Sequence, residues 1–165
     1  MSTKKDLHAE PLQDGYHPVS LKEAYKLIVP GQPVLVASRG QEQYNLAPIA
    51  WNCPLDYDPV TKVLFVCDPA HQTAANIKRT GQFALCIPDS PDDPLIQKCG
   101  SVSDPHVDKF GCFNIGWFKA TETDLRIPER CTGWIECRLI KVIPEGSVEI
   151  FLGEAVAAGT RDLLF

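Results

Sequence analysis

Residues 44–54, YNLAPIAWNCP, combine groups that could bind a ligand with groups that belong in a core. The side chains of Leu46 and Trp51 are too apolar for a free loop, whereas the amides of Asn45 and Asn52 are too polar for plain core packing. The proline in the middle of the stretch lacks a backbone N–H, which favours an edge, a bulge or a backbone turned toward a ligand. We therefore expect an irregular strand that buries one side and offers amide and backbone groups to a ligand on the other.

A second candidate binding element begins at Thr73 in the sequence TAANIKRTG. The stretch is typical of a short helix with Thr73 as its N-cap, Asp68 as the rival cap, and Gly81 just beyond its C-terminal end. Backbone N–H groups at a helix N-terminus suit a phosphate, and the hydroxyl of Thr73 could add a hydrogen bond. A plain capping role for Thr73 is compatible with phosphate binding, so both interpretations stay open.

The cysteines and histidines do not form a recognisable catalytic or metal-binding pattern. The seven cysteines are odd in number and have no C-x-x-C spacing, which favours a reduced cytosolic protein over a disulfide framework. Cys53 would need a neighbouring base to act as a nucleophile, and no base can be assigned to it. His71, His106 and Cys99 match no known ligand spacing. We therefore predict neither a catalytic side chain nor a metal.

Composition excludes several classes of protein. The formal net charge is −5 and no run of Lys or Arg occurs, which argues against a nucleic-acid-binding surface. The first fifteen residues lack the apolar region of a signal peptide. No run approaches the roughly 18 apolar residues that a membrane span needs. We expect a cytoplasmic protein that forms one domain.

Apolar and β-branched runs, separated by turn residues, predict a β-rich domain. A capping box of Ser20 and Glu23 predicts a short helix that ends at Pro30, and one helical turn is expected within residues 90–98. Residues 1–17 should be loose, residues 54–59 and 100–113 should be loops, and residues 114–130 have no clear pattern. The expected strands cover residues 33–38, 46–51, 62–67, 83–87, and 134–143 paired with 149–156 in a hairpin with a bulge at Gly153. Closure of these strands into a barrel would remove exposed edges.

Four segments, in order, resemble the flavin reductase-like proteins with an FMN-binding split barrel, and among them the flavoredoxins. The resemblance covers roughly residues 20–156. It is carried by PVLVAS followed by N-x-A-P-x-A-W (Asn45–Trp51), by T-A-A-N-I-x-x-T-G-x-F (Thr73–Phe83), by V-D-K-F (Val107–Phe110), and by the late W-I-E-C…G-E-A-V hairpin.

The resemblance implies a mainly β fold, a six-stranded Greek-key split barrel with a few short helices, over residues 18–165 after a flexible segment, 1–17. It also implies a homodimer with FMN in a groove near the dimer interface. The activity would be transfer of electrons or hydride through bound flavin, with NAD(P)H as a possible donor and a redox protein as a possible partner. No side-chain acid or base is required, because the flavin carries the chemistry.

The same resemblance implies a division of roles among the candidate residues, each with an ordinary structural alternative. Asn45 would reach the flavin with its amide, or else cap a turn. Trp51 would pack on the ring or else belong to the core, and Lys109 would bring positive charge or else lie on the surface. The predicted ring-binding residues are Asn45, Ala47, Trp51, Asn52 and Cys53, and the predicted phosphate-end residues are His71, Gln72, Thr73, Asn76 and Lys109.

The chain departs from the family pattern at two places. Family members often carry Arg or Lys before the helix, where this chain has His71 and Gln72, so phosphate binding would lose positive charge. They often have Gly-Asp-His in the late hairpin, where this chain has residues 146–148, GSV, which puts direct NAD(P)H oxidation in doubt. A non-redox barrel dimer that binds another ligand or a partner protein is the alternative, and a reductase that releases reduced FMN is a third possibility.

Overall fold

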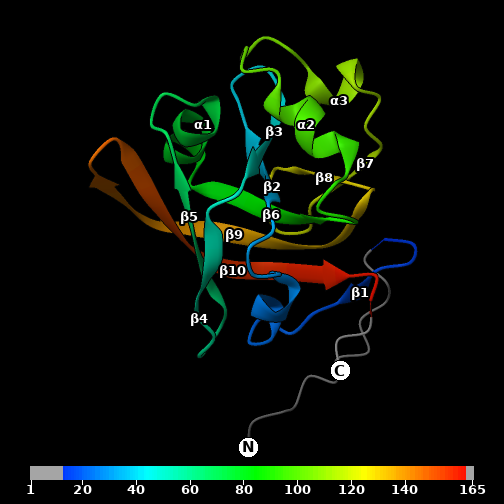
Figure 1. Cartoon of the computed structure of the whole chain (residues 1–165). Helices are drawn as coiled ribbons and strands as arrows, with labels where there is room; N and C mark the ends of the chain where they lie inside the picture. Colours follow the sequence, from blue (N-terminus) through cyan, green and yellow to red (C-terminus); the bar gives the residue numbers. More distant parts are fainter. Residues whose placement is uncertain (1–12, 163–165) are drawn as a thin grey trace, which may run out of the picture.

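The computed structural model describes residues 13–162 (Figure 1), so most of the predicted loose segment, residues 1–12, lies outside the described residues. The part of that segment that is described packs on the fold. Tyr16 is buried, and its hydroxyl donates to the backbone carbonyl of Glu129 at 2.9 Å. Strand β1 (His17–Pro18) then pairs with the last strand of the sheet.

One antiparallel sheet dominates the described part of the chain, which is therefore mainly β, as predicted. The sheet has eight strands rather than the predicted six, and its order is β3-β2-β6-β9-β10-β5-β4, with β1 beside β10. The remaining strands of this sheet are β2 (Val34–Arg39), β3 (Tyr44–Ile49), β4 (Asn52–Asp56), β5 (Lys62–Cys67), β6 (Gln82–Pro88), β9 (Cys131–Glu145) and β10 (Val148–Thr160).

The sheet curls into a split barrel because its two outermost strands are joined by only two residues. Strands β3 and β4 lie at opposite ends of the strand order, yet only Ala50 and Trp51 separate them in the sequence. The two edges must therefore come close in space where the chain passes from β3 to β4. A backbone hydrogen bond from Val66 N on β5 to Trp51 O at 3.0 Å extends the ladder of β4 and β5 into this link. The ladders of the described residues do not pair β3 with β5, so the barrel remains split there.

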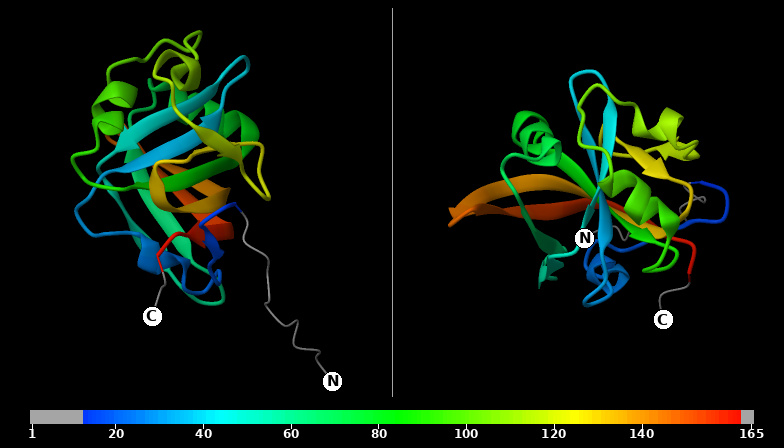
Figure 2. Two further views of the ribbon diagram at one scale, coloured as in Figure 1. Left: turned by 90° about the vertical axis from the view of Figure 1, so that its right-hand side faces the viewer. Right: turned by 45° about the horizontal axis from the view of Figure 1, so that its top comes forward.

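The helices and a two-stranded ribbon divide between two cores: η1 and α1 add buried residues to the core inside the barrel, whereas α2, α3 and the ribbon pack over a second core. Helix α1 packs on β2 and β3 from one side, and α2 and α3 pack on β3 from the other, as both views show (Figure 2). These elements are η1 (Ala24–Leu27, a 3-10 helix), α1 (Gln72–Thr80), α2 (Pro94–Gly100), α3 (Lys109–Cys112), and the ribbon of β7 (Trp117–Lys119) and β8 (Arg126–Pro128). None of the helices described is both long and apolar enough to span a membrane.

The strands of the barrel centre are buried on both faces, which explains their continuous apolar sequences. Along β2, Val36 faces the barrel interior with Phe65 and Phe151. The preceding residue, Leu35, faces the second core under the ribbon and the α2–α3 pair, where it packs near Trp134. Successive side chains of a strand point to opposite faces, so a strand between two cores is filled mainly with apolar side chains on both faces.

Three local predictions were wrong. The capping box does not form: the backbone N–H of Glu23 bonds to the carbonyl of Ser20, the Glu23 side chain pairs with Lys26, and only a 3-10 turn follows. Residues 54–59, predicted as a loop, contain most of β4, where Pro54 is tolerated because this strand is a sheet edge. Helix α3 lies within the loop predicted over residues 100–113. The bulge predicted at Gly153 is confirmed by a register shift.

Candidate functional site

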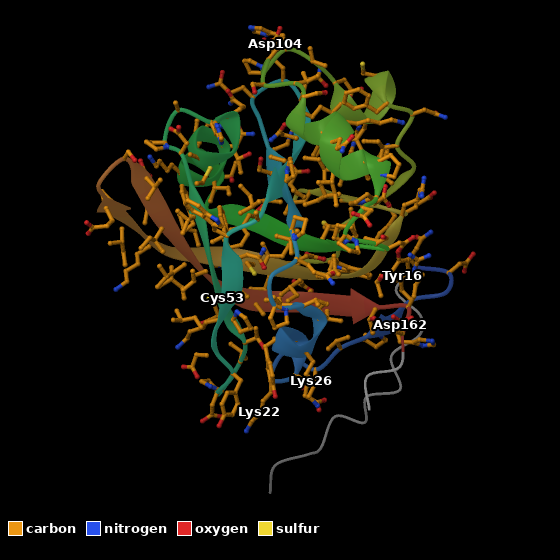
Figure 3. All side chains as sticks on the ribbon, viewed as in Figure 1. Tyr16, Lys22, Lys26, Cys53, Asp104 and Asp162 are labelled. Atoms are coloured by element: carbon orange, nitrogen blue, oxygen red, sulfur yellow. The ribbon has the colours of Figure 1, made fainter. Side chains whose placement is uncertain are left out.

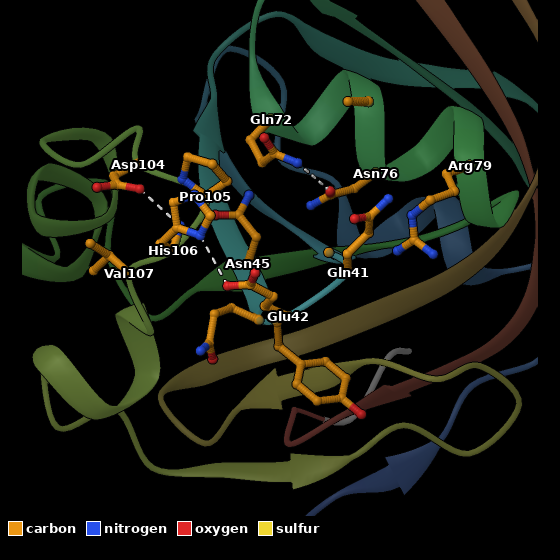
Figure 4. A pocket seen from close by; sticks show the side chains of 14 residues that line it. Gln41, Glu42, Asn45, Gln72, Asn76, Arg79, Asp104, Pro105, His106 and Val107 are labelled. Carbon is orange, nitrogen blue, oxygen red and sulfur yellow. Dashed lines mark hydrogen bonds and ion pairs between the residues drawn. The ribbon is translucent and has the colours of Figure 1, made fainter.

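Three adjoining cavities surround the N-terminal end of α1 and together form one groove, here called the β3–α1 groove. The inner cavity, of about 300 Å³, lies between the β2–β3 turn and α1 (Figure 4), and shares Asn45 and Gln72 with the central cavity of about 360 Å³. The central cavity shares Pro48 and His71 with the outer cavity of about 190 Å³. The groove therefore follows β3 from its beginning to its end.

Asn45 and Thr73 connect strand β3 to the first turn of α1. The amide of Asn45 donates to the hydroxyl of Thr73 at 3.2 Å, and Thr73 is buried. The prediction of Thr73 as N-cap is wrong, because His71 occupies that position and makes no side-chain capping bond. Since the first N–H groups of a helix have no intrahelical acceptor, this end of α1 presents donors to the central cavity.

A chain of side-chain hydrogen bonds runs along α1 into the interior. Gln72 donates to the amide oxygen of Asn76 at 2.7 Å (Figure 4), and Asn76 donates to the hydroxyl of Ser38 at 3.0 Å. Asn76 and Ser38 are both buried. Asn76 lines the inner cavity, but both ends of its amide are engaged by the protein, so its main role here is to fix Gln72.

Lys109 is buried beside the central cavity rather than exposed. Its ammonium group donates to the backbone carbonyls of Leu46 at 2.7 Å and Cys99 at 2.9 Å, which ties β3 to the end of α2. Burial lowers the pKa of the ammonium group. Among residues 13–162 no carboxylate forms an ion pair with Lys109. An ammonium group has three donors, so one remains for a ligand in the cavity that Lys109 lines.

The predicted site residues at the end of the motif do not all line the groove. Trp51 is 69% exposed and lines the outer cavity with His71. The amide of Asn52 donates to the carbonyls of Gln32 and Ile49, so it stabilises a turn. Cys53 lies on β4, far from Asp104 at the inner cavity (Figure 3).

The groove brings together the predicted residues Asn45, Ala47, Trp51, His71, Gln72, Thr73, Asn76 and Lys109, and its three cavities do not include Asn52 or Cys53.

The sequence did not point to two groups that line the inner cavity. Arg79 follows Gln72 and Asn76 at helical spacing on one face of α1, a signal that could have identified it, and it donates to the carbonyl of Arg39 at 2.7 Å. His106 pairs with Glu42 at 3.0 Å across the cavity mouth, and this hydrogen bond raises the pKa of His106. The pairing of His106 with Glu42 could not be predicted from the sequence, because 63 residues lie between them and no periodic pattern relates the two positions.

Comparison with known proteins agrees with this architecture. The flavin reductase like domain model matches residues 27–165. The chain is 29% identical to the uncharacterized protein YddH of Escherichia coli (strain K12) over 152 residues, which are 90% of this chain and 80% of that protein.

Two solved structures are also similar. The FMN-binding domain of a flavin reductases-like enzyme from Shewanella baltica OS155 is 29% identical with a TM-score of 0.76, covering 88% of this chain and 77% of that one. Flavoredoxin from Methanosarcina acetivorans is 25% identical with a TM-score of 0.69, covering 80% and 70%. Because the domain model spans most of the sequence, this chain belongs to the flavin reductase like domain family.

Proposed function

We propose that this protein binds FMN in the β3–α1 groove and transfers electrons or hydride through it. The observation that supports this most is the buried Lys109, a cation without a described carboxylate partner, beside the open N-terminal end of α1. A buried cation favours an anionic ligand, because pairing offsets its desolvation. FMN supplies the redox chemistry when it is bound, and the protein contributes binding and orientation.

The roles of the groove residues follow from their positions. The N–H groups at the start of α1 and the hydroxyl of Thr73 would hold the phosphate, since helix N-termini favour anions. Asn45 and Ala47 would contact the ring along β3, and Trp51 would cover it at the rim. His71 and Gln72 bring no fixed charge to the phosphate, so Lys109 would supply the cation.

Titration of the purified protein with FMN tests this proposal. We expect quenching of flavin fluorescence at one site per chain, with weaker binding of FAD. Thr73→Val should weaken FMN binding about 10- to 150-fold, because one hydrogen bond to a charged group is worth about 1.5–3 kcal/mol. Arg138→Gln, an exposed change on β9, is the control and should leave affinity unchanged. A protein that binds neither FMN nor FAD would refute the proposal.

The oligomeric state belongs to the same proposal. Phe65 and Phe151 point into the barrel, so the residues before and after them along each strand point outward. Two apolar rows result on the outer face of β4, β5, β9 and β10. One row contains Ile143, Ile150 and Val66, and the other contains Leu152, Leu64 and Cys53.

Self-association through this face would give a homodimer, because contiguous apolar surface favours burial. Light scattering should give twice the monomer mass for the wild type and the monomer mass for Ile150→Lys. A monomeric wild type would exclude the proposed homodimer.

A cytoplasmic location is also proposed, since all seven cysteines are free thiols.

A further inference from the structure

The β7–β8 ribbon buries one face and presents the other to solvent beside the groove. Phe118 and Ile127 are buried in the second core. On the opposite face Trp117 is 41% exposed, and Lys119 is exposed next to Arg126, its partner in the register. This outer face, formed by Trp117, Lys119 and Arg126 with Tyr44 of β3, is here called the ribbon face.

Arg126 lies at the centre of the ribbon face between two aromatic rings. Its guanidinium carbon is 3.9 Å from the ring centre of Trp117 and 4.5 Å from that of Tyr44. Arg39 stacks on Tyr44 at 4.2 Å. These contacts orient the guanidinium group rigidly, since stacked Arg side chains lose little further freedom on binding.

The charge of Arg126 is uncompensated, in contrast to that of Arg39. Arg39 pairs with Asp124 at 3.5 Å. No carboxylate within residues 13–162 pairs with Arg126, and its buried Nε has no hydrogen-bond partner there. Burial of the Nε without a partner is costly, because this donor loses water without gaining an acceptor. The terminal nitrogens of the guanidinium group also have no partner among these residues, but they are not buried, so an acceptor from outside can reach them. The face is therefore built to receive an acceptor from outside.

We propose that the ribbon face docks an acidic segment of a partner protein, with an Asp or Glu carboxylate on the guanidinium group of Arg126. Carboxylates match the planar fork of Arg in two parallel hydrogen bonds. The described cavities do not include Arg126 or Trp117, so the feature is a surface rather than a small-molecule pocket. Trp, Tyr and Arg are also the residues enriched at the energetic centres of protein interfaces.

The partner would sit at the mouth of the inner cavity, because Tyr44 belongs to both the ribbon face and that cavity. Its binding does not depend on flavin, so this inference stands apart from the function proposed above.

Calorimetric titration with poly-L-glutamate at low ionic strength tests the docking surface. The wild type should bind, and Arg126→Gln should lower the association constant about tenfold or more, a loss of about 1.4 kcal/mol. Arg138→Gln removes the same charge from an exposed site on β9 and should change binding less than about twofold. Arg126→Lys keeps the charge but loses the fork, so its affinity should lie between those of the wild type and Arg126→Gln.

Three results would overturn the proposal. If the Arg126 and Arg138 variants lose the same affinity for poly-L-glutamate, binding depends only on the net charge of the protein. Tighter binding of inorganic polyphosphate than of poly-L-glutamate would assign the face to phosphate. Self-association that Arg126→Gln abolishes, in the absence of any probe, would assign the face to a second copy of this chain. Far-UV circular dichroism shows whether each variant is folded. If Arg126→Gln is not folded, the comparison with the wild type uses Arg126→Lys instead.

Discussion

At the scale of single residues, Lys109 couples the stability of the fold to the chemistry of the groove. Replacing it by Met should lower the free energy of unfolding by about 1–3 kcal/mol, because the carbonyls of Leu46 and Cys99 each lose a buried donor. FMN affinity should fall as well, through loss of the only cation proposed for the phosphate. Urea unfolding without flavin separates the two effects. Lys98→Met, an exposed change on α2, is the matched control.

The same residue makes a prediction about pH. Burial lowers the pKa of Lys109 in the folded state below its ordinary value of 10.5, so the folded protein binds fewer protons there than the unfolded chain does. Stability rises with pH wherever the unfolded state binds more protons. The stability of the wild type relative to Lys109→Met should therefore increase as the pH approaches 10.5. A difference that falls over this range would contradict the assignment.

Glu136 is a buried carboxylate that holds the turn after β7 against the sheet. Its oxygens accept bonds from the backbone of Thr121 at 2.8 Å and Glu122 at 2.8 Å, and from the indole of Trp134 at 3.2 Å. Glu136→Gln should cost about 3 kcal/mol, because an amide NH₂ would face donors and charge-assisted bonds would be lost. Chemical unfolding measures the loss. Glu122→Gln, at an exposed position, should change stability by less than about 0.5 kcal/mol.

At the scale of elements, the long β9–β10 hairpin depends on a glycine in its bulge. A Cβ at Gly153 would collide with the ring of Phe83 and come within 3.1 Å of Cys137. Gly153→Ala should therefore destabilise the protein by about 1–3 kcal/mol, as overpacking of cores does. Gly146→Ala in the hairpin turn has open space but a φ of +57°. Gly146→Ala should therefore lower the free energy of unfolding by only about 1–2 kcal/mol. If both variants lose the same stability and the surroundings of Phe83 do not change, a Cβ at position 153 does not collide with this ring.

Local sequence predicted those elements that have their own strong pattern. The apolar runs of β2 and β5 were located within a residue or two, because both strands are rich in β-branched residues and end at turn residues. Strand β4 was missed, since the prolines that suggested a loop are allowed on an edge strand. The β7–β8 ribbon was missed because each strand has only three residues, too few to show an alternation.

At the scale of the whole molecule, buried thiols should make the fold sensitive to alkali. Burial raises the pKa of Cys131 to about 12 and those of Cys86 and Cys137 well above the ordinary 9.0. At a pH between the unfolded pKa of 9.0 and the raised pKa of the folded state, the unfolded chain releases protons that the folded protein keeps. The stability contributed by these thiols is therefore fully present below pH 9 and falls above it. Each such thiol should lower the free energy of unfolding by about 1.4 kcal/mol between pH 8 and pH 10.

Urea unfolding at pH 8 and pH 10 measures this loss. Cys137→Ala should reduce the difference between the two pH values by about 1.4 kcal/mol, because one buried thiol no longer ionises on unfolding. Cys53→Ala should leave the difference unchanged, since Cys53 is exposed in the folded protein as well. A wild type that is equally stable at both pH values would contradict the burial of the thiols.

The sequence by itself determined the mainly β class, most of the strand positions and the stretch from Asn45 to Trp51 as a decorated strand, because periodicity and turn residues are local properties. Only the tertiary structure decided which of the candidate binding side chains line the same cavity. Asn45 meets Thr73 across 28 residues and Lys109 reaches Leu46 across 63, while Asn52, in the same motif as Asn45, turns its amide to the chain itself. The curl of the sheet brings β3, α1 and α3 together, and no local pattern encodes that closure.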